Sequence, residues 1–243
     1  MSDNNENMIK IEKLKKIIAK SKKIVFFTGA GVSTESGIKD FRGKDGISKY
    51  TDIPIEILIS KSYFYKHTLE FYDYYKKCFN CIDKKPNITH YFIKKLEDEG
   101  KVLGVITQNV DGLHYKAGST NVVELHGTIY KNRCVDCGKE YTPQYVFNSE
   151  GIPKCTCGGI IKPDVVLYEE SLPEKAIYEA SKLVRDADTL IVLGTSLQVM
   201  PASSYVASFN GDNLVIINLD STPFDQYADL VIHDKLSNVM EKL

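Results

Sequence analysis

Four cysteines have the spacing of a metal site. Cys134 and Cys137 are separated by two residues, and a second pair, Cys155 and Cys157, follows after 17 intervening residues. Two cysteine pairs arranged in this way predict that four thiolates hold a zinc ion. Because four protein ligands leave no open coordination position, this zinc would be structural, with one ion per chain. An iron–sulfur cluster is the chemical alternative, since thiolates hold it as well.

The residues around these cysteines bear on that prediction. Gly138 and Gly158 each follow the second cysteine of a pair, where glycine permits a turn that directs backbone N–H groups at the sulfurs. The second pair is one residue shorter than usual, which we expect to strain the site without preventing it. Cys78 and Cys81 also have a metal-like spacing. They lie in a stretch with helical periodicity, however, and we interpret them as free thiols.

A glycine loop after an apolar run could bind a nucleotide. Residues 23–28, KIVFFT, predict a buried parallel strand, and Gly29-Ala30-Gly31 follows at once. Glycines at this point permit a tight turn and a close approach of the backbone to a pyrophosphate, which the N–H groups of a following helix would face. Thr34 stands where the usual fingerprint has its third glycine. On its own, the loop therefore also fits a turn that binds no ligand.

Three more polar clusters stand where predicted strands end. They are residues 108–111, residues 194–196 and Asn218. In an open α/β sheet, ligands bind at the carboxyl ends of the strands. Together with the glycine loop, these clusters predict one composite site.

The elements that must position these clusters alternate along the chain. The predicted strands cover residues 23–28, 101–107, 122–125, 189–193, 213–219 and 230–232. The predicted helices cover residues 9–20, 87–99 and 173–185, with two or three short helices in 53–81. This alternation predicts an α/β fold. We expect a Rossmann-like parallel sheet flanked by helices, with a small inserted zinc-ribbon module and a helical module.

Longer strings of residues connect the clusters to a known family. The strings are GAGVSTESGIKDFRG at 29–43, TQNVDGLH at 107–114, LHG at 125–127 and GTSL at 194–197. With the cysteine module, they resemble the signatures of the sirtuin family, in the family's order and over nearly the whole chain. The resemblance implies one catalytic domain. Its Rossmann-like part would cover residues 8–42, 84–129 and 164–243, its helical insert 43–83, and its zinc module 130–163.

The resemblance implies an NAD-dependent protein lysine deacetylase. In this family, the acyl oxygen of the substrate lysine attacks C1′ of the nicotinamide ribose of NAD, and nicotinamide leaves. A histidine then removes a proton from a ribose hydroxyl, and the products are free lysine, nicotinamide and O-acetyl-ADP-ribose. His126 matches this general base, and Asn109 matches a contact to the ribose and the catalytic water. An unperturbed histidine titrates near pH 6.5, which suits proton removal at neutral pH.

Further positions match residues that hold NAD in the family. Phe41 matches the aromatic side chain that shields the reacting carbon from water, and Arg42 matches a residue that fixes the loop and the phosphates. Val110 and Asp111 match the pocket for the nicotinamide carboxamide. The whole set expected to contact NAD is Gly29, Ala30, Gly31, Thr34, Asp40, Phe41, Arg42, Gln108, Val110, Asp111, Gly194, Thr195, Ser196, Asn218 and Lys235.

Two segments match those that sandwich the substrate peptide as an added β-strand, residues 165–170 and 197–201. The residues expected to contact an acetyl-lysine protein or peptide are Val165, Val166, Leu167, Tyr168, Val199, Tyr72 and Tyr75. Tyr75 takes the position of an arginine that marks relatives preferring succinyl or malonyl lysine. The sequence therefore predicts a hydrophobic acyl pocket, although an alignment shifted by one residue would bring Lys76 to that position.

Two departures from the family pattern affect the site. Lys39 stands where proline is usual, which we expect to loosen the cofactor loop. Glu169 replaces a common glycine beside the peptide cleft, and its charge would favour basic peptides.

Composition limits the other functions open to the chain. The net charge is −1 and no apolar run has membrane length, so nothing favours nucleic acid or membrane as a partner. The N-terminal residues lack the apolar core of a signal peptide, and we expect a cytoplasmic protein that is a monomer. Two alternatives stay open. One is a mono-ADP-ribosyltransferase that uses the same NAD site, and the other is a zinc-ribbon module that binds DNA or protein.

Overall fold

The main sheet has six parallel strands and contains every strand predicted for the Rossmann-like part. A computed structural model describes residues 2–40, 46, 47 and 51–243. The sheet order is β3-β2-β1-β7-β8-β9. The strands are β1 (Ile24–Thr28), β2 (Val102–Thr107), β3 (Val122–Glu124), β7 (Thr189–Leu193), β8 (Asn213–Ile217) and β9 (Leu230–Ile232). The strand order reverses between β1 and β7, and in open α/β sheets ligands bind outside the carboxyl ends of the strands at such a point.

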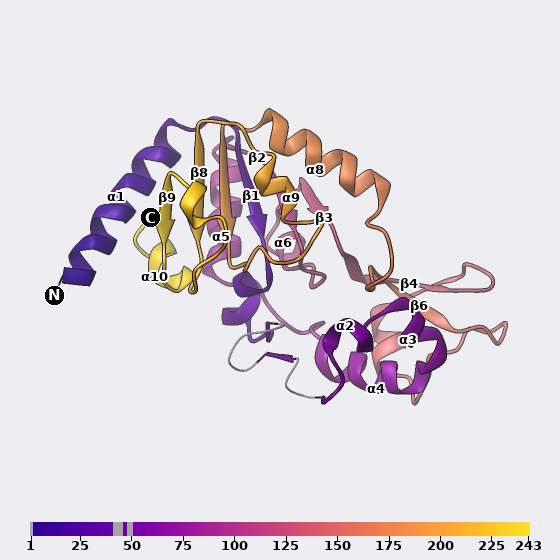
Figure 1. Cartoon of the computed structure of the whole chain (residues 1–243). Helices are drawn as coiled ribbons and strands as arrows, with labels where there is room; N and C mark the ends of the chain where they lie inside the picture. The colour runs from indigo at the N-terminus through magenta and orange to yellow at the C-terminus, as the bar shows by residue number, and fades with distance from the viewer. Residues whose placement is uncertain (1, 41–45, 48–50) are drawn as a thin grey trace.

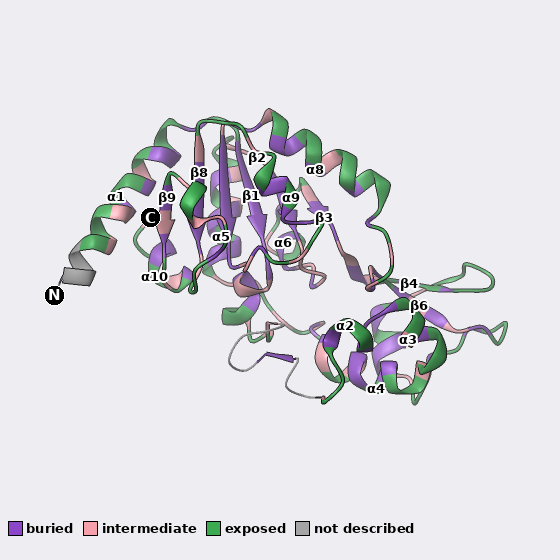
Figure 2. Cartoon of the chain, viewed as in Figure 1, coloured by how far each residue is buried: buried purple, intermediate pink, exposed green. Residues whose placement is uncertain are grey.

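Helices cover both faces of this sheet (Figure 1). One face packs on α1 (Ser2–Lys20), α5 (Ile88–Asp98) and α10 (Leu236–Met240), and the other on α8 (Glu174–Asp186) and α9 (Ser204–Ala207). Successive side chains of β1 alternate between the two cores, since Phe26 lies in the first while Val25 and Phe27 lie in the second. Both faces are therefore dry, and Figure 2 shows the central strands as buried.

A second, smaller domain joins the helical insert to the cysteine-rich module. It contains α2 (Ile55–Leu58), α3 (Lys61–Lys66), α4 (Thr68–Phe79), α7 (Pro143–Asn148) and an antiparallel sheet of β4 (Gly127–Cys134), β5 (Glu140–Tyr141) and β6 (Ile161–Val165). Phe71 and Tyr75 from α4 share one apolar core with Ile129, Phe147 and Ile161. The two predicted modules thus bury their apolar faces against each other.

Some elements differ from the prediction. The glycine loop continues as a 3-10 helix, η1 (Ala30–Ser36), and the helices α6 (Leu113–Lys116), α7, α9 and α10 and the 3-10 helix η3 (Asp225–Tyr227) were not predicted. These helices span three to six residues, which is too short for a 3.6-residue period to be visible. The stretch 53–81 contains three helices, as expected.

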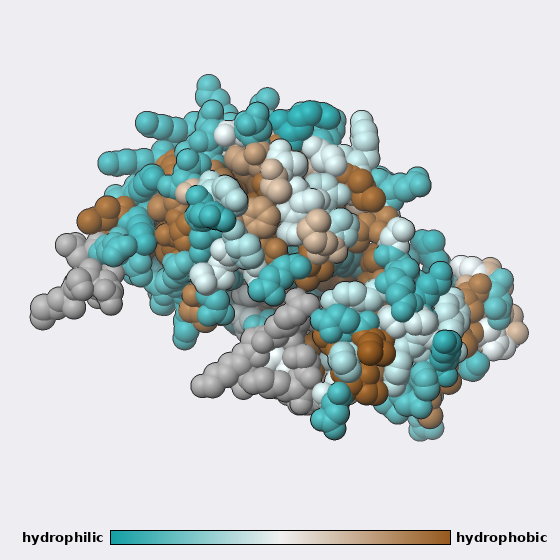
Figure 3. Space-filling view, viewed as in Figure 1, coloured by the Kyte–Doolittle hydropathy of each residue, from teal (hydrophilic) through white to brown (hydrophobic). Residues whose placement is uncertain are grey.

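The apolar surface is limited in this view. Figure 3 shows apolar side chains gathered over α2, where Ile57 is exposed beside Ile53. In the described residues, no helix combines the length and the apolar character that a bilayer span requires.

Two histidines are buried in the helices next to the main sheet. His90 of α5 and His114 of α6 are 0% and 2% exposed. Burial lowers the pKa of His90 to about 4, and burial together with the nearby His90 lowers the pKa of His114 to about 3. Both rings are therefore neutral at pH 7.

Acidification is expected to destabilise the fold through these two residues. In the unfolded chain each histidine titrates near its ordinary pKa of 6.5, so below that pH the unfolded state binds more protons than the folded state. The free energy of unfolding should fall by about 1.4 kcal/mol per pH unit for each histidine as the pH drops from about 6.5 towards 4. Urea unfolding at pH 7.5 and 5.5 measures this loss. His114→Gln should reduce the loss by about 1.4 kcal/mol and the exposed His67→Gln should leave it unchanged, so equal losses in wild type and His114→Gln would contradict the assignment.

Candidate functional site

The loops after β1 and β7 meet at the point where the strand order reverses. Gly29 N donates to Leu193 O at 3.1 Å, and Gly31 N donates to Gly194 O at 2.8 Å. A Cβ atom on Gly29 would lie 2.6 Å from Thr195 Cβ, and one on Gly31 would lie 2.7 Å from Gly194 Cα. Both glycines are therefore required by contact between two protein loops, a reason that the sequence alone does not reveal.

The polar cluster after β2 binds to both loops. Gln108 Nε2 donates to Thr195 Oγ1 at 3.0 Å, and Asn109 Nδ2 donates to Gly29 O at 3.0 Å. Asn109 Nδ2 also lies 3.2 Å from Ser33 Oγ. Three motifs that are far apart in the sequence thus form one hydrogen-bonded site, as the strand-end argument predicts.

Asp111 is anchored within this network. Its carboxylate accepts from Ser33 Oγ at 2.6 Å and from Leu113 N at 2.9 Å, and the residue is 5% exposed. Burial raises the pKa of Asp111, while these hydrogen bonds act in the opposite direction. Ser33 was not among the predicted site residues. Its position inside the glycine loop, on the opening turn of a predicted helix, is the signal that could have identified it.

His126 has one ring nitrogen in a defined role. Its Nδ1 lies 3.0 Å from Gln108 O, and because a carbonyl can only accept, Nδ1 must carry the proton. In the neutral ring, Nε2 then has the free lone pair and can take up a proton. Burial lowers the pKa of His126, and the Gln108 hydrogen bond partly offsets this. The geometry therefore suits a general base at neutral pH.

Backbone contacts connect His126 to the predicted peptide segment. His126 O accepts from Val166 N at 2.9 Å, and a Cβ atom on Gly127 would lie 1.9 Å from Asp164 O. At the far end of the segment, Tyr168 N donates to Ile59 O at 3.1 Å in the small domain. The segment therefore runs from the histidine to the small domain, with Val165 and Leu167 buried along it.

An ion pair stiffens this segment. Lys162 Nζ lies 3.1 Å from Glu170 Oε2, which also accepts from Leu167 N at 2.9 Å. Lys162 Nζ donates to Val165 O at 3.2 Å as well. Residues 163–167 are thus clamped from both ends.

Glu169 is engaged with the small domain. Its φ of 71° lies in the left-handed region that favours glycine, the residue common there in the family. Its carboxylate accepts from Ser62 N at 2.9 Å and Ser62 Oγ at 2.8 Å. The Glu169 carboxylate therefore faces α3. The expected preference for basic peptides stays a prediction, and the hydrogen bonds to Ser62 leave less of this charge available to a peptide.

Tyr72 and Tyr75 lie in the core of the small domain. They are 0% and 1% exposed, and the Tyr72 hydroxyl donates to Ile161 O. The Tyr75 ring stacks on Phe147 at 5.3 Å. The cysteine-rich module covers both rings, and their assignment to an acyl pocket stays a prediction.

Lys76, the residue that an alignment shifted by one would bring to the arginine position, is bound by other protein groups. Lys76 Nζ donates to Ser149 O and Gly151 O, both at 2.6 Å. Of the arginines in the described residues, Arg133 lies 3.3 Å from Glu140 and Arg185 lies 3.2 Å from Asp186. These cations therefore bind protein groups and do not form a fork for an acyl carboxylate.

Three further predicted residues, Asn218, Thr34 and Lys235, have described positions. Asn218, at the end of β8, donates to Asp220 O at 2.7 Å and its carbonyl lies 3.0 Å from His233 Nδ1. Thr34 donates to Gly31 O at 3.0 Å, and Lys235 is exposed at the start of α10. Phe41 and Arg42 lie outside the described residues. The positions not yet placed are Ala30 in η1, Asp40 after it, Val110 after β2, Ser196 after β7, and Val199 in the following loop.

The four cysteines come together as their spacing predicts. Their Sγ atoms lie within 4.8 Å of one another, and Cys134–Cys157, Cys137–Cys155 and Cys137–Cys157 are each separated by 3.5 Å. Sulfurs about 2.3 Å from a tetrahedral zinc ion would lie about 3.8 Å apart. Zinc therefore fits between these thiolates.

Glycines shape the cysteine site as well. Gly138 and Gly158 adopt φ angles of 74° and 93°, which confirms the predicted turns. Cys157 N donates to Cys155 Sγ at 3.5 Å. A Cβ atom on Gly159 would lie 2.7 Å from Cys134 Sγ, so this third glycine also makes room for a sulfur. Cys78 lies in α4 and Cys81 follows that helix, and their interpretation as free thiols stays a prediction.

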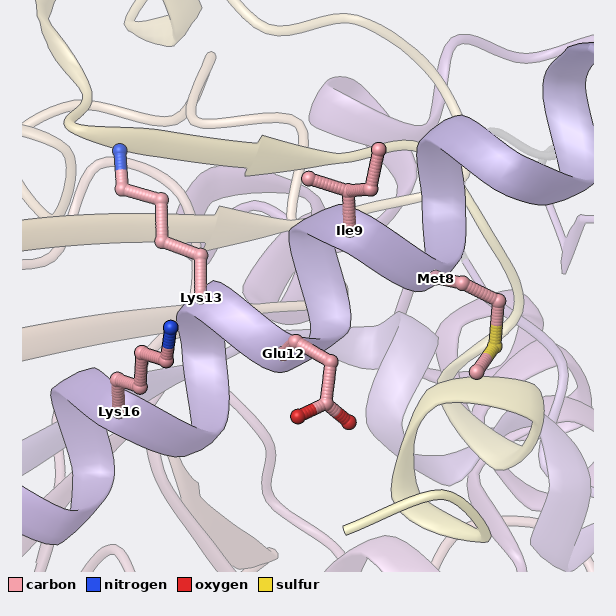
Figure 4. A pocket seen from close by; sticks show the side chains of 5 residues that line it. All are labelled: Met8, Ile9, Glu12, Lys13 and Lys16. Atoms are coloured by element: carbon pink, nitrogen blue, oxygen red, sulfur yellow. The ribbon is translucent and has the colours of Figure 1, made fainter.

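A shallow surface hollow lies elsewhere. It measures about 350 Å³ and is lined by side chains of α1 alone (Figure 4). The lining residues are Met8, Ile9, Glu12, Lys13 and Lys16. No predicted site residue borders it, so the candidate site rests on the hydrogen-bond network at the strand ends.

These features define an α/β nucleotide-binding protein with an inserted four-thiolate ribbon. The sequence model of the Sir2 family matches residues 29–201. The chain belongs to the Sir2, or sirtuin, family, which confirms the resemblance seen in its motifs.

Relatives and solved structures agree with this membership. Proteins named NAD-dependent protein deacetylase are 50% identical in Clostridium acetobutylicum, over 96% of this chain and 97% of the relative, and 49% identical in Staphylococcus epidermidis, over 96% of each. A Sir2 protein with a deacetylated p53 peptide and 3′-O-acetyl ADP ribose superposes with a TM-score of 0.89. Another with a p53 peptide and NAD+ gives 0.84. Each structure is 38% identical and covers 96% of both chains.

Proposed function

We propose that this protein is an NAD-dependent protein lysine deacetylase that releases nicotinamide and O-acetyl-ADP-ribose. The observation that carries the proposal is the position of His126. Its proton-accepting Nε2 belongs to a ring held by Gln108, and Gln108 in turn binds the loop of Thr195 beside the glycine loop. A base is thus positioned at the nucleotide crevice, where NAD would bring an activated ribose carbon.

The chain's own residues support the separate steps. The N–H groups of η1 are suited to a pyrophosphate, and Asp111, fixed by Ser33, would meet the carboxamide of nicotinamide. His126 would take the proton of a ribose hydroxyl at Nε2. Asn109, bound to Gly29 O, would orient the ribose or a water molecule.

The peptide would bind beside residues 165–170 and 197–201. Backbone pairing of an extended peptide supplies affinity without a strict sequence requirement. Val166 follows β6 and is tied to His126 O, so an acyl-lysine lying against this segment would enter near the base. Tyr72 and Tyr75 have no part in this proposal, because both are buried in the small domain.

Product analysis tests the proposal. The protein would be incubated with an acetyl-lysine peptide, with and without NAD, and the products followed by mass spectrometry. We expect acetyl loss only with NAD, one O-acetyl-ADP-ribose for each lysine released, and slower reaction of the matched succinyl peptide. NAD consumption with ADP-ribose attached to protein would instead identify a mono-ADP-ribosyltransferase, and faster desuccinylation would overturn the acyl preference.

A further inference from the structure

The cofactor loop is held from behind by a buried chain of polar side chains. We propose that Asn87, His90, His114 and Thr28 position this loop, and that Asn87 is a positioning residue for NAD. The proposal rests on the proposed NAD site and adds Thr28, Asn87 and His90, which lie outside the motifs of the site, and His114, which closes the motif at 107–114. None of the four would touch the nucleotide.

Asn87 serves two elements with the two ends of one amide. Its Oδ1 caps α5 by accepting from Thr89 N at 3.0 Å. Its Nδ2 donates to Val32 O at 2.8 Å and to Ser36 Oγ at 3.0 Å, and both acceptors belong to η1. The cap requires only an acceptor, whereas the contacts with η1 require the NH₂ group. The two functions can therefore be separated by substitution.

The two histidines connect Asn87 with the start of the loop. His90 Nδ1 accepts from Asn87 N at 3.3 Å, and the His90 and His114 rings pack with their centroids 4.9 Å apart. His114 Nε2 lies 3.0 Å from Thr28 Oγ1, and Thr28 directly precedes Gly29. These polar side chains thus contact the last residue of β1, just before the loop, and the loop again in η1.

The two histidines leave polar atoms unpaired in a packed core, which is unusual. Among the described residues, His90 Nε2 and His114 Nδ1 are buried without a hydrogen-bond partner. Unpaired buried polar atoms destabilise a fold, so apolar side chains would serve packing better at these positions. The contacts that polar groups make with Thr28, and through Asn87 with Val32 and Ser36, supply a reason for them.

Loss of these contacts should lower the affinity for NAD and leave the affinity for the peptide unchanged. A 3-10 helix of seven residues has weak internal hydrogen bonding, so its geometry depends on outside contacts. Loss of the Asn87 NH₂ would release Val32 O and Ser36 Oγ together, and NAD would then have to order the loop when it binds. Among the described residues, the side chain of Asn87 bonds to α5 and η1 and not to the peptide segment at 165–170, so peptide affinity should stay the same.

Substitution of Asn87 by Asp and by Ser tests the proposal. Both residues keep the acceptor that caps α5, and neither can donate the two hydrogen bonds to η1. We expect the Kd for NAD, measured by calorimetry on the zinc-loaded protein, to rise about tenfold in both variants. The melting temperature and the KM for peptide should change little. Thr28→Val removes the hydroxyl that contacts His114 while keeping the shape of the side chain, and it should also raise the Kd for NAD. Asn148→Asp, an exposed change on α7, is the matched control.

The outcomes separate this inference from the proposed function. An unchanged Kd for NAD in folded Asn87→Asp and Asn87→Ser would overturn the positioning role. So would a parallel loss of NAD affinity, peptide affinity and melting temperature, because that would mark a purely structural residue. If wild type binds NAD but does not deacetylate, the proposed function fails while the binding data still decide on Asn87. A wild type that binds no NAD would overturn both.

Discussion

Replacing His126 by alanine is expected to lower kcat for deacetylation by about 100- to 10,000-fold, the range that general-base catalysis supplies. The ring is the proton acceptor, and its orientation is set through Nδ1 by Gln108 O, so the substitution removes the base and leaves the loops around it in place. Steady-state kinetics with an acetyl-lysine peptide measures the loss. The Kd for NAD and the melting temperature should stay close to those of wild type.

Two controls sharpen that experiment. His67→Ala removes a histidine whose side chain is 51% exposed on the small domain, and its activity should equal that of wild type. The pH dependence of kcat/KM should show an acid limb below about pH 6.5, because burial lowers the pKa of His126 and the base must be neutral. Residual activity above half of wild type in His126→Ala would refute the assignment.

Loss of the metal is expected to unfold the small domain and abolish deacetylation. Thiolate–zinc bonding contributes up to about 10–16 kcal/mol in isolated zinc modules, more than most domains have in total stability. Cys134 and Cys155 are buried in the same core as Phe147 and Ile161, and β6 of this domain leads directly into the predicted peptide segment. Metal analysis should find one zinc per chain in wild type.

The test variant is Cys155→Ser, compared with Cys78→Ser, which changes a cysteine of α4 in the same domain that lies outside the four-sulfur cluster. The first should lose zinc, near-ultraviolet circular dichroism and activity, whereas the second should keep all three. Iron with visible absorbance in the purified protein would favour the iron–sulfur alternative. A folded, active Cys155→Ser would show that the metal is dispensable.

Local chemistry made much of the fold predictable. The central strands β1, β7 and β8 are short apolar runs buried on both faces, so their continuous hydrophobic character identifies them without reference to partners. The cysteine pairs and the strand-end clusters were also visible, because metal ligands and turn glycines require specific residue types at fixed spacing. Very short helices such as α9 and α10 carry no such signal, since packing against the sheet stabilises them.

Sequence by itself determined which residues could do chemistry, whereas tertiary structure decided how they do it. The string around His126 predicts a base, but only the contact with Gln108 O determines which ring nitrogen accepts the proton. The glycine loop predicts a nucleotide site, but only the approach of Gly194 and Thr195 explains why side chains are excluded at Gly29 and Gly31.

The same distinction applies to the predicted acyl pocket and to Asn87. Tyr72 and Tyr75 match a pocket position by alignment, yet the cysteine module packs over α4 and buries both rings. Asn87 matches only a helix cap, yet its amide also reaches across to η1. Contacts between segments distant in sequence depend on how whole elements pack, and no local pattern of residues records that packing.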